Sequence, residues 1–218
     1  MKKHIVCLGD SNTHGYCADP SDCADGGDRF NEAERWPCLL QSALGPDYLV
    51  YEEGLTGRTT VFDDPLEEGL SALGYLSPCL RSHAPVELLS LMLGTNDVKE
   101  RFGASAACIA LGLERLIRKA QSEPSCWGQR GPNLLVLAPP PIGAGLETSA
   151  VAATMGRGCV EKARALPPLY RETAQRLGCH FFDAGEVGEY NTADFMHLTC
   201  RGHAQLAGAL ARLVPALV

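Results

Sequence analysis

The chain has 218 residues, of which 45% are hydrophobic and 21% charged, a composition typical of a globular protein with room for one α/β domain. Its formal net charge of −7 argues against a partner that is nucleic acid or an anionic membrane surface. The apolar runs fall short of the roughly 20 residues that a membrane-spanning helix needs, and the first residues lack a signal-peptide core.

The ten cysteines are scattered along the chain and form no C-x-x-C pair. Several of them lie inside apolar runs, where a cysteine behaves as a small hydrophobic side chain. We interpret them as reduced thiols rather than as a disulfide framework. Together with the missing export signal, this interpretation predicts a cytoplasmic protein.

Five short apolar runs recur along the chain and predict strands. They cover residues 4–8, 48–51, 86–93, 134–138 and 179–182. Runs that are apolar almost throughout are typical of strands buried on both faces of a parallel sheet.

Helical patterns lie between these runs. Apolar residues recur at helical spacing over residues 108–120. A second helix is opened by Pro167 and Pro168, and a third begins at a Thr199 cap and ends before Pro215. The alternation of strands and helices predicts one domain over residues 1–218, with helices on both faces of a parallel sheet.

Three loops follow predicted strands, at residues 16–34, 56–67 and 139–155. The first two are rich in Asp and Gly, and the third opens with three prolines. In an open α/β sheet, ligands bind in the crevice at the carboxyl ends of the strands. We therefore expect all three loops to line one site.

The residues of a serine nucleophile system occur at the two ends of the chain. Ser11 follows the first strand, and His197 follows Asp194 by three residues. A serine hydroxyl needs an adjacent base, and that base needs a partner to fix its tautomer. Taken singly, each residue has a plainer interpretation, because Ser11 also suits a helix cap and His197 a packed side chain.

Donors for an oxyanion occur in the two middle blocks. Asn96 ends an apolar run, and its side chain can donate to an oxyanion. Gly57 offers a backbone N–H that a ligand can approach closely, and Gly54 is a second candidate for that role. Asn and Gly at strand ends are also ordinary turn residues.

These four blocks together resemble the SGNH (GDSL-type) hydrolases, which are named for Ser, Gly, Asn and His. The resemblance spans essentially the whole chain and is strongest to the bacterial aryl esterase and acyltransferase branch. It implies a five-stranded parallel sheet in flavodoxin-like order. It also implies a catalytic triad, which would consist of Ser11, Asp194 and His197. The oxyanion hole that it implies would consist of Ser11, Gly57 and Asn96.

The sequence departs from the family pattern beside the nucleophile. Asn12 stands where the family name has Leu, and His14 stands where similar sequences carry Trp. With Asp10 and Trp36, these two residues are the candidates for the substrate pocket. Trp36 and Phe62 would add apolar surface to the wall of the site if they face it, but an equally good interpretation places both in the core or in subunit contacts.

Other classes of site lack their patterns. The chain has no phosphate-binding G-x-x-x-x-G-K-[ST], no dinucleotide-binding G-x-G-x-x-G after a strand, and no zinc-ligand spacing, so no metal or cofactor is expected. We predict a serine esterase that acts on small acetyl-like esters, with transfer to alcohols as a further activity and self-assembly as a further property. The alternatives are a deacetylase of acetylated carbohydrates and a non-enzymatic flavodoxin-like binding module.

Overall fold

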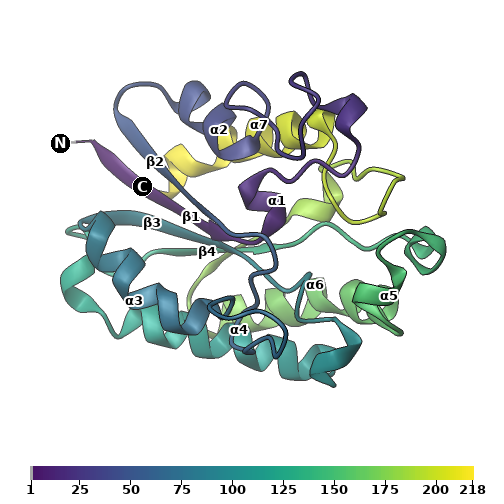
Figure 1. The fold of residues 1–218 in the computed structure, drawn as a ribbon. Coiled ribbons are helices and arrows are strands. Elements are labelled where there is room, and N and C mark those ends of the chain that lie inside the picture. The colour runs from purple at the N-terminus through teal and green to yellow at the C-terminus, as the bar shows by residue number, and fades with distance from the viewer. Residues whose placement is uncertain (1) are drawn as a thin grey trace.

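A computed structural model describes residues 2–218. Its five strands pair in parallel in the order β2-β1-β3-β4-β5, which is the flavodoxin-like order. Figure 1 shows the sheet between two layers of helices, so the predicted three-layer α/β/α fold is confirmed. The strands are β1 Lys3–Gly9, β2 Tyr48–Gly54, β3 Val86–Met92, β4 Leu134–Ala138 and β5 His180–Asp183.

The helices divide between the two faces of the sheet. One face is covered by α2 (Trp36–Leu44) and α7 (Cys200–Leu217), and the other by α3 (Ala72–His83), α4 (Ala106–Gln121) and α6 (Cys159–Arg176) (Figure 1). The short helices are α1 (Ser11–His14), α5 (Ala152–Met155) and the 3₁₀ turns Pro20–Asp22, Glu100–Phe102, Pro124–Cys126, Ala144–Thr148 and Ala184–Glu186.

The apolar strands feed two cores, one on each face. In β1, Val6 and Leu8 join the core beneath α3, α4 and α6, whereas Ile5 and Cys7 join the core beneath α2 and α7. Successive side chains of a strand point to opposite faces, so a run buried on both sides must be apolar throughout. This explains why the strands were visible in the sequence.

Two helices extend beyond the prolines that we expected to bound them. Pro167 and Pro168 lie inside α6, and Pro215 lies inside the last turn of α7. The predicted boundaries are therefore wrong. Burial outweighs the lost backbone hydrogen bonds, because α6 places Leu166 before the two prolines and Tyr170 after them in the core.

The ten cysteines are free thiols. Over residues 2–218, no helix combines the length and the apolar character that a bilayer crossing requires.

Candidate active site

The local fold presents Ser11 at the carboxyl edge of the sheet. β1 ends at Gly9, the Asp10 carboxylate caps the backbone amide of Asn12 at 3.0 Å, and Ser11 begins α1. A Cβ on Gly9 would lie 2.0 Å from the Thr13 hydroxyl, so only glycine lets α1 fold back this closely on the strand. Because α1 is a single turn of four residues, its dipole contributes little at Ser11.

Ser11, His197 and Asp194 form a continuous chain of hydrogen bonds. The Ser11 hydroxyl lies 2.8 Å from His197 Nε2, and His197 Nδ1 lies 2.5 Å from Asp194 Oδ2. The three residues are almost fully buried, with exposed fractions of 3%, 6% and 4% in the same order. This is the arrangement in which an imidazole takes the serine proton while a carboxylate fixes the imidazole tautomer.

The surroundings of Asp194 keep it ionised. Its Oδ1 accepts hydrogen bonds from the amides of Met196 and His197 and from the Asn191 side chain, each at 3.1 Å. Burial acts to raise the pKa of Asp194, but the hydrogen bond and charge of His197 and the two amides outweigh burial and lower it. Phe195, which directly follows Asp194, adopts a left-handed backbone with φ 62°, the kind of strain that functional sites retain.

The three donors proposed for the oxyanion face the same space. Within residues 2–218, the backbone amides of Ser11 and Gly57 donate no hydrogen bond. The Asn96 amide donates one of its hydrogens to the Arg58 carbonyl at 3.1 Å, which orients the side chain and leaves the other hydrogen for a ligand. Ser11, Gly57 and Asn96 all line one cavity.

The two glycines of the second block have different surroundings. Gly57 has a φ of 84°, which favours glycine, and it lines the cavity. A Cβ on Gly54 would lie 2.1 Å from the His14 backbone nitrogen, so Gly54 allows β2 to pack against α1. The geometry therefore favours Gly57 as the oxyanion donor.

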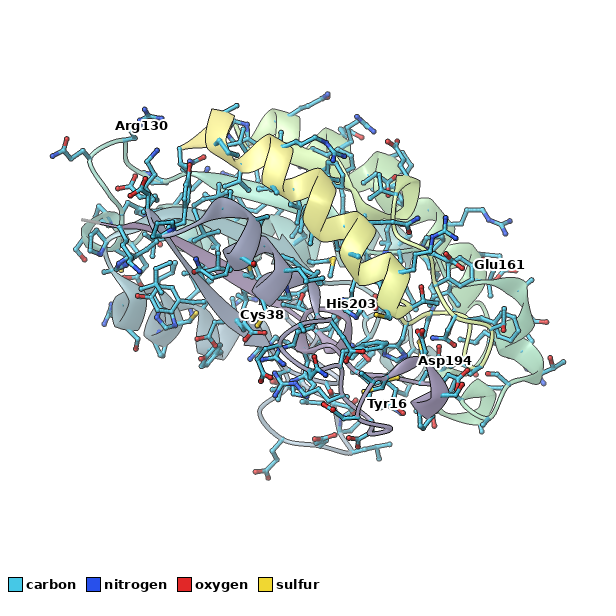
Figure 2. All side chains as sticks on the ribbon, turned by 90° about the horizontal axis from the view of Figure 1, so that it is seen from above. Tyr16, Cys38, Arg130, Glu161, Asp194 and His203 are labelled. Atoms are coloured by element: carbon cyan, nitrogen blue, oxygen red, sulfur yellow. The ribbon has the colours of Figure 1, made fainter. Side chains whose placement is uncertain are left out.

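The cavity has a volume of about 350 Å³ and opens beside the Ser11–His197 pair. Each of the three predicted loops contributes to it, with Tyr16 from the first, Glu67 from the second and Met155 from the third. Figure 2 shows Tyr16 and Asp194 near the N-terminal end of α7, far from Arg130 at the other end of the molecule.

The four residues expected to form the substrate pocket do not line this cavity. Trp36 is fully buried, and its indole N–H donates to the Asn12 carbonyl at 3.0 Å. The Asn12 side chain bonds to the backbone on both sides of His197. Trp36 and Asn12 therefore hold the backbone around the triad and do not contact a ligand in the cavity.

The other two expected pocket residues also point elsewhere. Asp10 is fully buried, burial raises its pKa to about 6, and its Oδ2 has no hydrogen-bond partner. His14 packs against β2 at Gly54, and burial lowers its pKa. Phe62, named as a possible wall of the site, packs against the Phe102 ring at 5.8 Å and does not line the cavity.

Sequence reasoning missed several residues that the fold brings to the site. The Tyr16 ring lies 4.7 Å from the His197 ring, Asn191 holds Asp194, and Lys99 and Arg101 line the cavity. The position of Lys99, three residues after Asn96 and just beyond the same block, was a usable signal. Asn191 carried none, because its role depends on the conformation of the loop.

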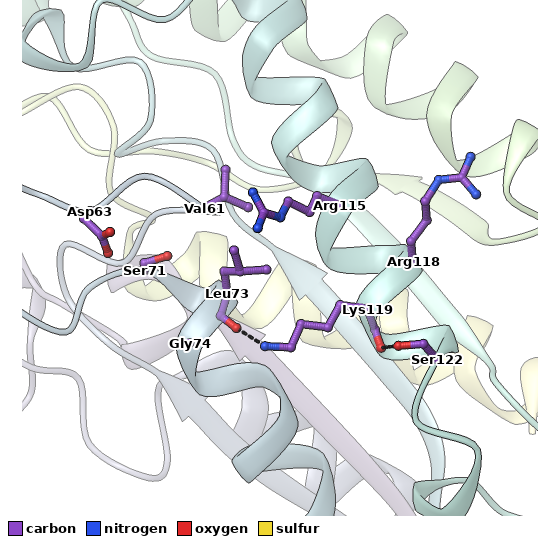
Figure 3. A pocket seen from close by; sticks show the side chains of 9 residues that line it. All are labelled: Val61, Asp63, Ser71, Leu73, Gly74, Arg115, Arg118, Lys119 and Ser122. Atoms are coloured by element: carbon purple, nitrogen blue, oxygen red, sulfur yellow. Dashed lines mark hydrogen bonds between the residues drawn. The ribbon is translucent and has the colours of Figure 1, made fainter.

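A larger hollow of about 720 Å³ lies between α3 and α4, away from the triad (Figure 3). It contains Ser71 and Lys119, but among its lining residues no histidine accompanies the serine. The Lys119 ammonium donates to the Leu73 carbonyl. This hollow therefore lacks the serine–histidine pair that the cavity beside Ser11 has.

One group of side chains has the composition of a metal site. Potential ligand atoms of Glu53, Cys79 and His83 lie within 4.8 Å of one another. The sequence offered no metal-ligand spacing because Glu53 comes from β2 and the other two from α3. Glu53 already bonds to His83 Nε2 and to the Tyr75 hydroxyl, each at 2.6 Å, so both of its carboxylate oxygens are engaged.

Residues 7–205 match the GDSL-like Lipase/Acylhydrolase family. The chain belongs to this family of ester hydrolases. The family predicted from the four blocks is thereby confirmed. Because this is a family of ester hydrolases, the protein is an enzyme and not a flavodoxin-like binding module. Comparison with curated protein sequences gives no significant match.

Solved structures of the family are similar over the full length. A carbohydrate acetylesterase family member from Sinorhizobium meliloti is 36% identical with a TM-score of 0.86, over 99% of this chain and 98% of that one. Another carbohydrate acetylesterase from the same organism is 32% identical with a TM-score of 0.88, over 100% of both chains. An aryl esterase from M. smegmatis is 33% identical with a TM-score of 0.86, over 99% of this chain and 100% of that one.

Proposed function

We propose that the protein hydrolyses esters of small, acetyl-like acyl groups through an acyl intermediate on Ser11. The observation that carries this proposal is the hydrogen-bond chain from Ser11 through His197 to Asp194 at the mouth of a cavity. The cavity of about 350 Å³ is near the lower end of the range for small-molecule pockets, which favours a short acyl group.

In the first half of the reaction, the Ser11 oxygen attacks the ester carbonyl while His197 Nε2 takes the serine proton. The carbonyl oxygen becomes negative and accepts hydrogen bonds from the amides of Ser11 and Gly57 and from the Asn96 side chain. His197 then gives its proton to the departing alcohol, and the acyl group remains on Ser11.

In the second half, water enters where the alcohol left. His197 takes a proton from the water, whose oxygen attacks the acyl carbonyl, and the same three donors hold the oxyanion. Collapse of this intermediate releases the acid, and His197 returns the proton to Ser11. Asp194 stays ionised throughout and stabilises the imidazolium.

The test is a panel of para-nitrophenyl esters of increasing acyl length, run with the wild type and with Ser11→Ala. We expect acetyl and other short esters to be hydrolysed best and Ser11→Ala to lose nearly all activity while its circular dichroism is unchanged. Mass spectrometry should find a fluorophosphonate adduct on Ser11. An adduct on a different residue would refute the assignment.

A second candidate substrate class is acetylated carbohydrates. The similarity to the two carbohydrate acetylesterases at 36% and 32% identity favours it, as does Thr56 in the cavity wall. Acetate release from acetylated xylose, compared with para-nitrophenyl acetate at equal concentration, decides between the two classes. A higher kcat/KM on the sugar would favour the deacetylase.

We also propose transfer of the acyl group to alcohols. An alcohol that reaches the acyl enzyme competes with water, and the apolar side chains of Val151, Met155 and Met196 in the cavity wall favour such an acceptor. Product analysis with para-nitrophenyl acetate and rising concentrations of a primary alcohol tests this. If only acetic acid forms at every concentration, transfer is absent.

Two further proposals rest on the sequence alone. A cytoplasmic location can be tested by cell fractionation, and self-assembly by light scattering of the purified chain.

A further inference from the structure

Lys99 is a buried cation in the wall of the cavity that holds Ser11. Its exposed fraction is 7%, and it lines the cavity together with Ser11 and His197. In the part of the chain that the structure describes, its ammonium makes no hydrogen bond and no ion pair. A charge removed from water without a partner is costly, so this arrangement calls for an explanation.

Three charged groups near Lys99 are engaged elsewhere or stand in solvent, and a fourth, the buried Asp10, partly offsets the charge of Lys99 without bonding to it. Arg101 binds Asp64 Oδ2 through two nitrogens, at 2.9 and 3.2 Å, so the carboxylate of Asp64 is already paired. Glu67 lies on the exposed rim. Burial, followed by the charge of Arg101, lowers the pKa of Lys99, as expected for an ammonium whose charge is incompletely compensated.

The ammonium of Lys99 remains open to the cavity. Within residues 2–218, four polar side-chain atoms without a partner are sealed from solvent, and they belong to Asp10, Thr13, Thr95 and His203 rather than to Lys99. A molecule bound in the cavity can therefore reach the ammonium.

The backbone places Lys99 beside the oxyanion donors. The Lys99 amide donates to the Asn96 carbonyl at 3.2 Å, so the two residues belong to one turn at the end of β3. An ester whose carbonyl oxygen is held by Asn96 thus has the cation on the same side of the cavity.

From these observations we propose that Lys99 selects ester substrates that carry a carboxylate, by pairing with that carboxylate while the ester carbonyl lies beside Ser11. The inference deepens the proposed function and rests on it. A single ammonium is a compact point charge suited to a monoanion, whereas phosphate recognition usually relies on the forked geometry of arginine or on several donors. The carboxylate can sit on the acyl group or on the alcohol.

Two substrate pairs separate these positions. For the acyl side, the mono-para-nitrophenyl ester of adipic acid is compared with its methyl ester. For the alcohol side, para-acetoxybenzoate is compared with methyl para-acetoxybenzoate. In each pair, the readout is the ratio of kcat/KM for the free carboxylate to kcat/KM for the neutral ester, which cancels any general change in activity.

The variant is Lys99→Met, which keeps a long unbranched side chain and removes the charge. The matched control is Lys2→Met, which removes an exposed lysine at the opposite edge of the sheet. We expect Lys99→Met to lower the ratio roughly 10- to 100-fold, the range for loss of one hydrogen bond to a charged group. Lys2→Met should leave the ratio as in the wild type.

The two substrate pairs show which part of the ester carries the carboxylate. A fall in the adipate pair places the carboxylate on the acyl group, and a fall in the benzoate pair places it on the alcohol. Unchanged ratios in both pairs overturn the inference. The wild type and Ser11→Ala on para-nitrophenyl acetate report separately on the proposed function, which stands or falls without reference to Lys99.

A measurement on the wild type keeps the test independent of how the variant folds. Benzoate and benzamide have nearly the same shape, and both can be assayed as competitive inhibitors of para-nitrophenyl acetate hydrolysis. We expect benzoate to inhibit at lower concentration and to lose that advantage in high salt. Equal inhibition by the two compounds would contradict a cation site in the cavity.

Discussion

The Asn12 side-chain oxygen accepts a hydrogen bond from the Leu198 backbone amide at 2.9 Å, joining positions 186 residues apart. The same side chain donates from Nδ2 to the Met196 carbonyl at 3.2 Å. These two bonds lie on either side of His197, so Asn12 ties the loop of the base to the turn of the nucleophile. The family name has Leu at this position. Asn replaces it here and makes hydrogen bonds that a Leu side chain could not make.

Replacing Asn12 by Leu removes both bonds and leaves a buried N–H and a buried carbonyl without partners. We expect kcat to fall about 10- to 100-fold through misplacement of His197 relative to Ser11, with KM little changed. Steady-state kinetics on para-nitrophenyl acetate measure this. Asn12→Asp, which keeps only the acceptor, should give an intermediate kcat. A loss confined to thermal stability, with kcat intact, would contradict a positioning role.

Asp194→Asn tests the orientation of the base. The Asn side chain would present an N–H to His197 Nδ1, which forces the other ring nitrogen to carry the proton and prevents it from accepting the Ser11 proton. We expect kcat to fall by about 10⁴-fold, as such an exchange does in other serine hydrolases. The hydrogen bonds from the Met196 and His197 amides can persist, so the loop should keep its shape in a thermal melt. Activity within a factor of about ten of the wild type would refute the triad.

Asn96→Ala tests the oxyanion hole. We expect kcat to fall about 10²- to 10³-fold with a small change in KM, because the donor acts on charge that develops after binding. Asn133→Ala is the matched control, since the Asn133 amide also donates to backbone carbonyls, those of Glu87 and Leu217 at 2.9 Å each, but at the opposite edge of the sheet. The control should lose stability and keep kcat. Equal effects of the two variants on kcat would argue against an oxyanion role for Asn96.

Much of the fold could be predicted from the sequence because the strands depend on local patterns. The strands are apolar on both faces, which leaves a continuous signal, and the parallel order brings their carboxyl ends to one edge. Ser11 and Asn96 follow β1 and β3, which are neighbours in the sheet, so their proximity follows from the topology. The helices α2 and α3 were not predicted, because Pro78 interrupts the pattern of α3 and α2 has only nine residues.

The pocket was harder to predict because proximity in sequence does not fix direction. His14 is three residues from Ser11, yet the single turn of α1 directs it toward β2. Trp36 is adjacent to the site but is enclosed by the core. Asn191, by contrast, reaches the site through the shape of its loop, which depends on long-range contacts that a sequence pattern does not encode.

The buried His203 makes the free energy of unfolding depend on pH, and one substitution can separate its contribution from those of other groups. Its Nδ1 accepts from the Trp36 amide at 3.2 Å, and its Nε2 has no partner among the residues that the structure describes. Burial, with smaller contributions from the charges of His197 and Arg35, lowers the pKa of His203 from 6.5 to about 3. Between these values, the unfolded chain binds a proton that the folded chain does not.

The contribution of His203 to stability is therefore complete above its unfolded pKa and is lost progressively as the pH falls toward 3. His203→Asn keeps an acceptor for the Trp36 amide and does not titrate. Urea unfolding should show that the wild type loses about 1 kcal/mol more than this variant between about pH 6 and pH 5. The variant loses packing against the Phe30 ring at both pH values, so that cost cancels in the comparison. Parallel losses in the two proteins would mean that His203 takes up its proton in the folded state.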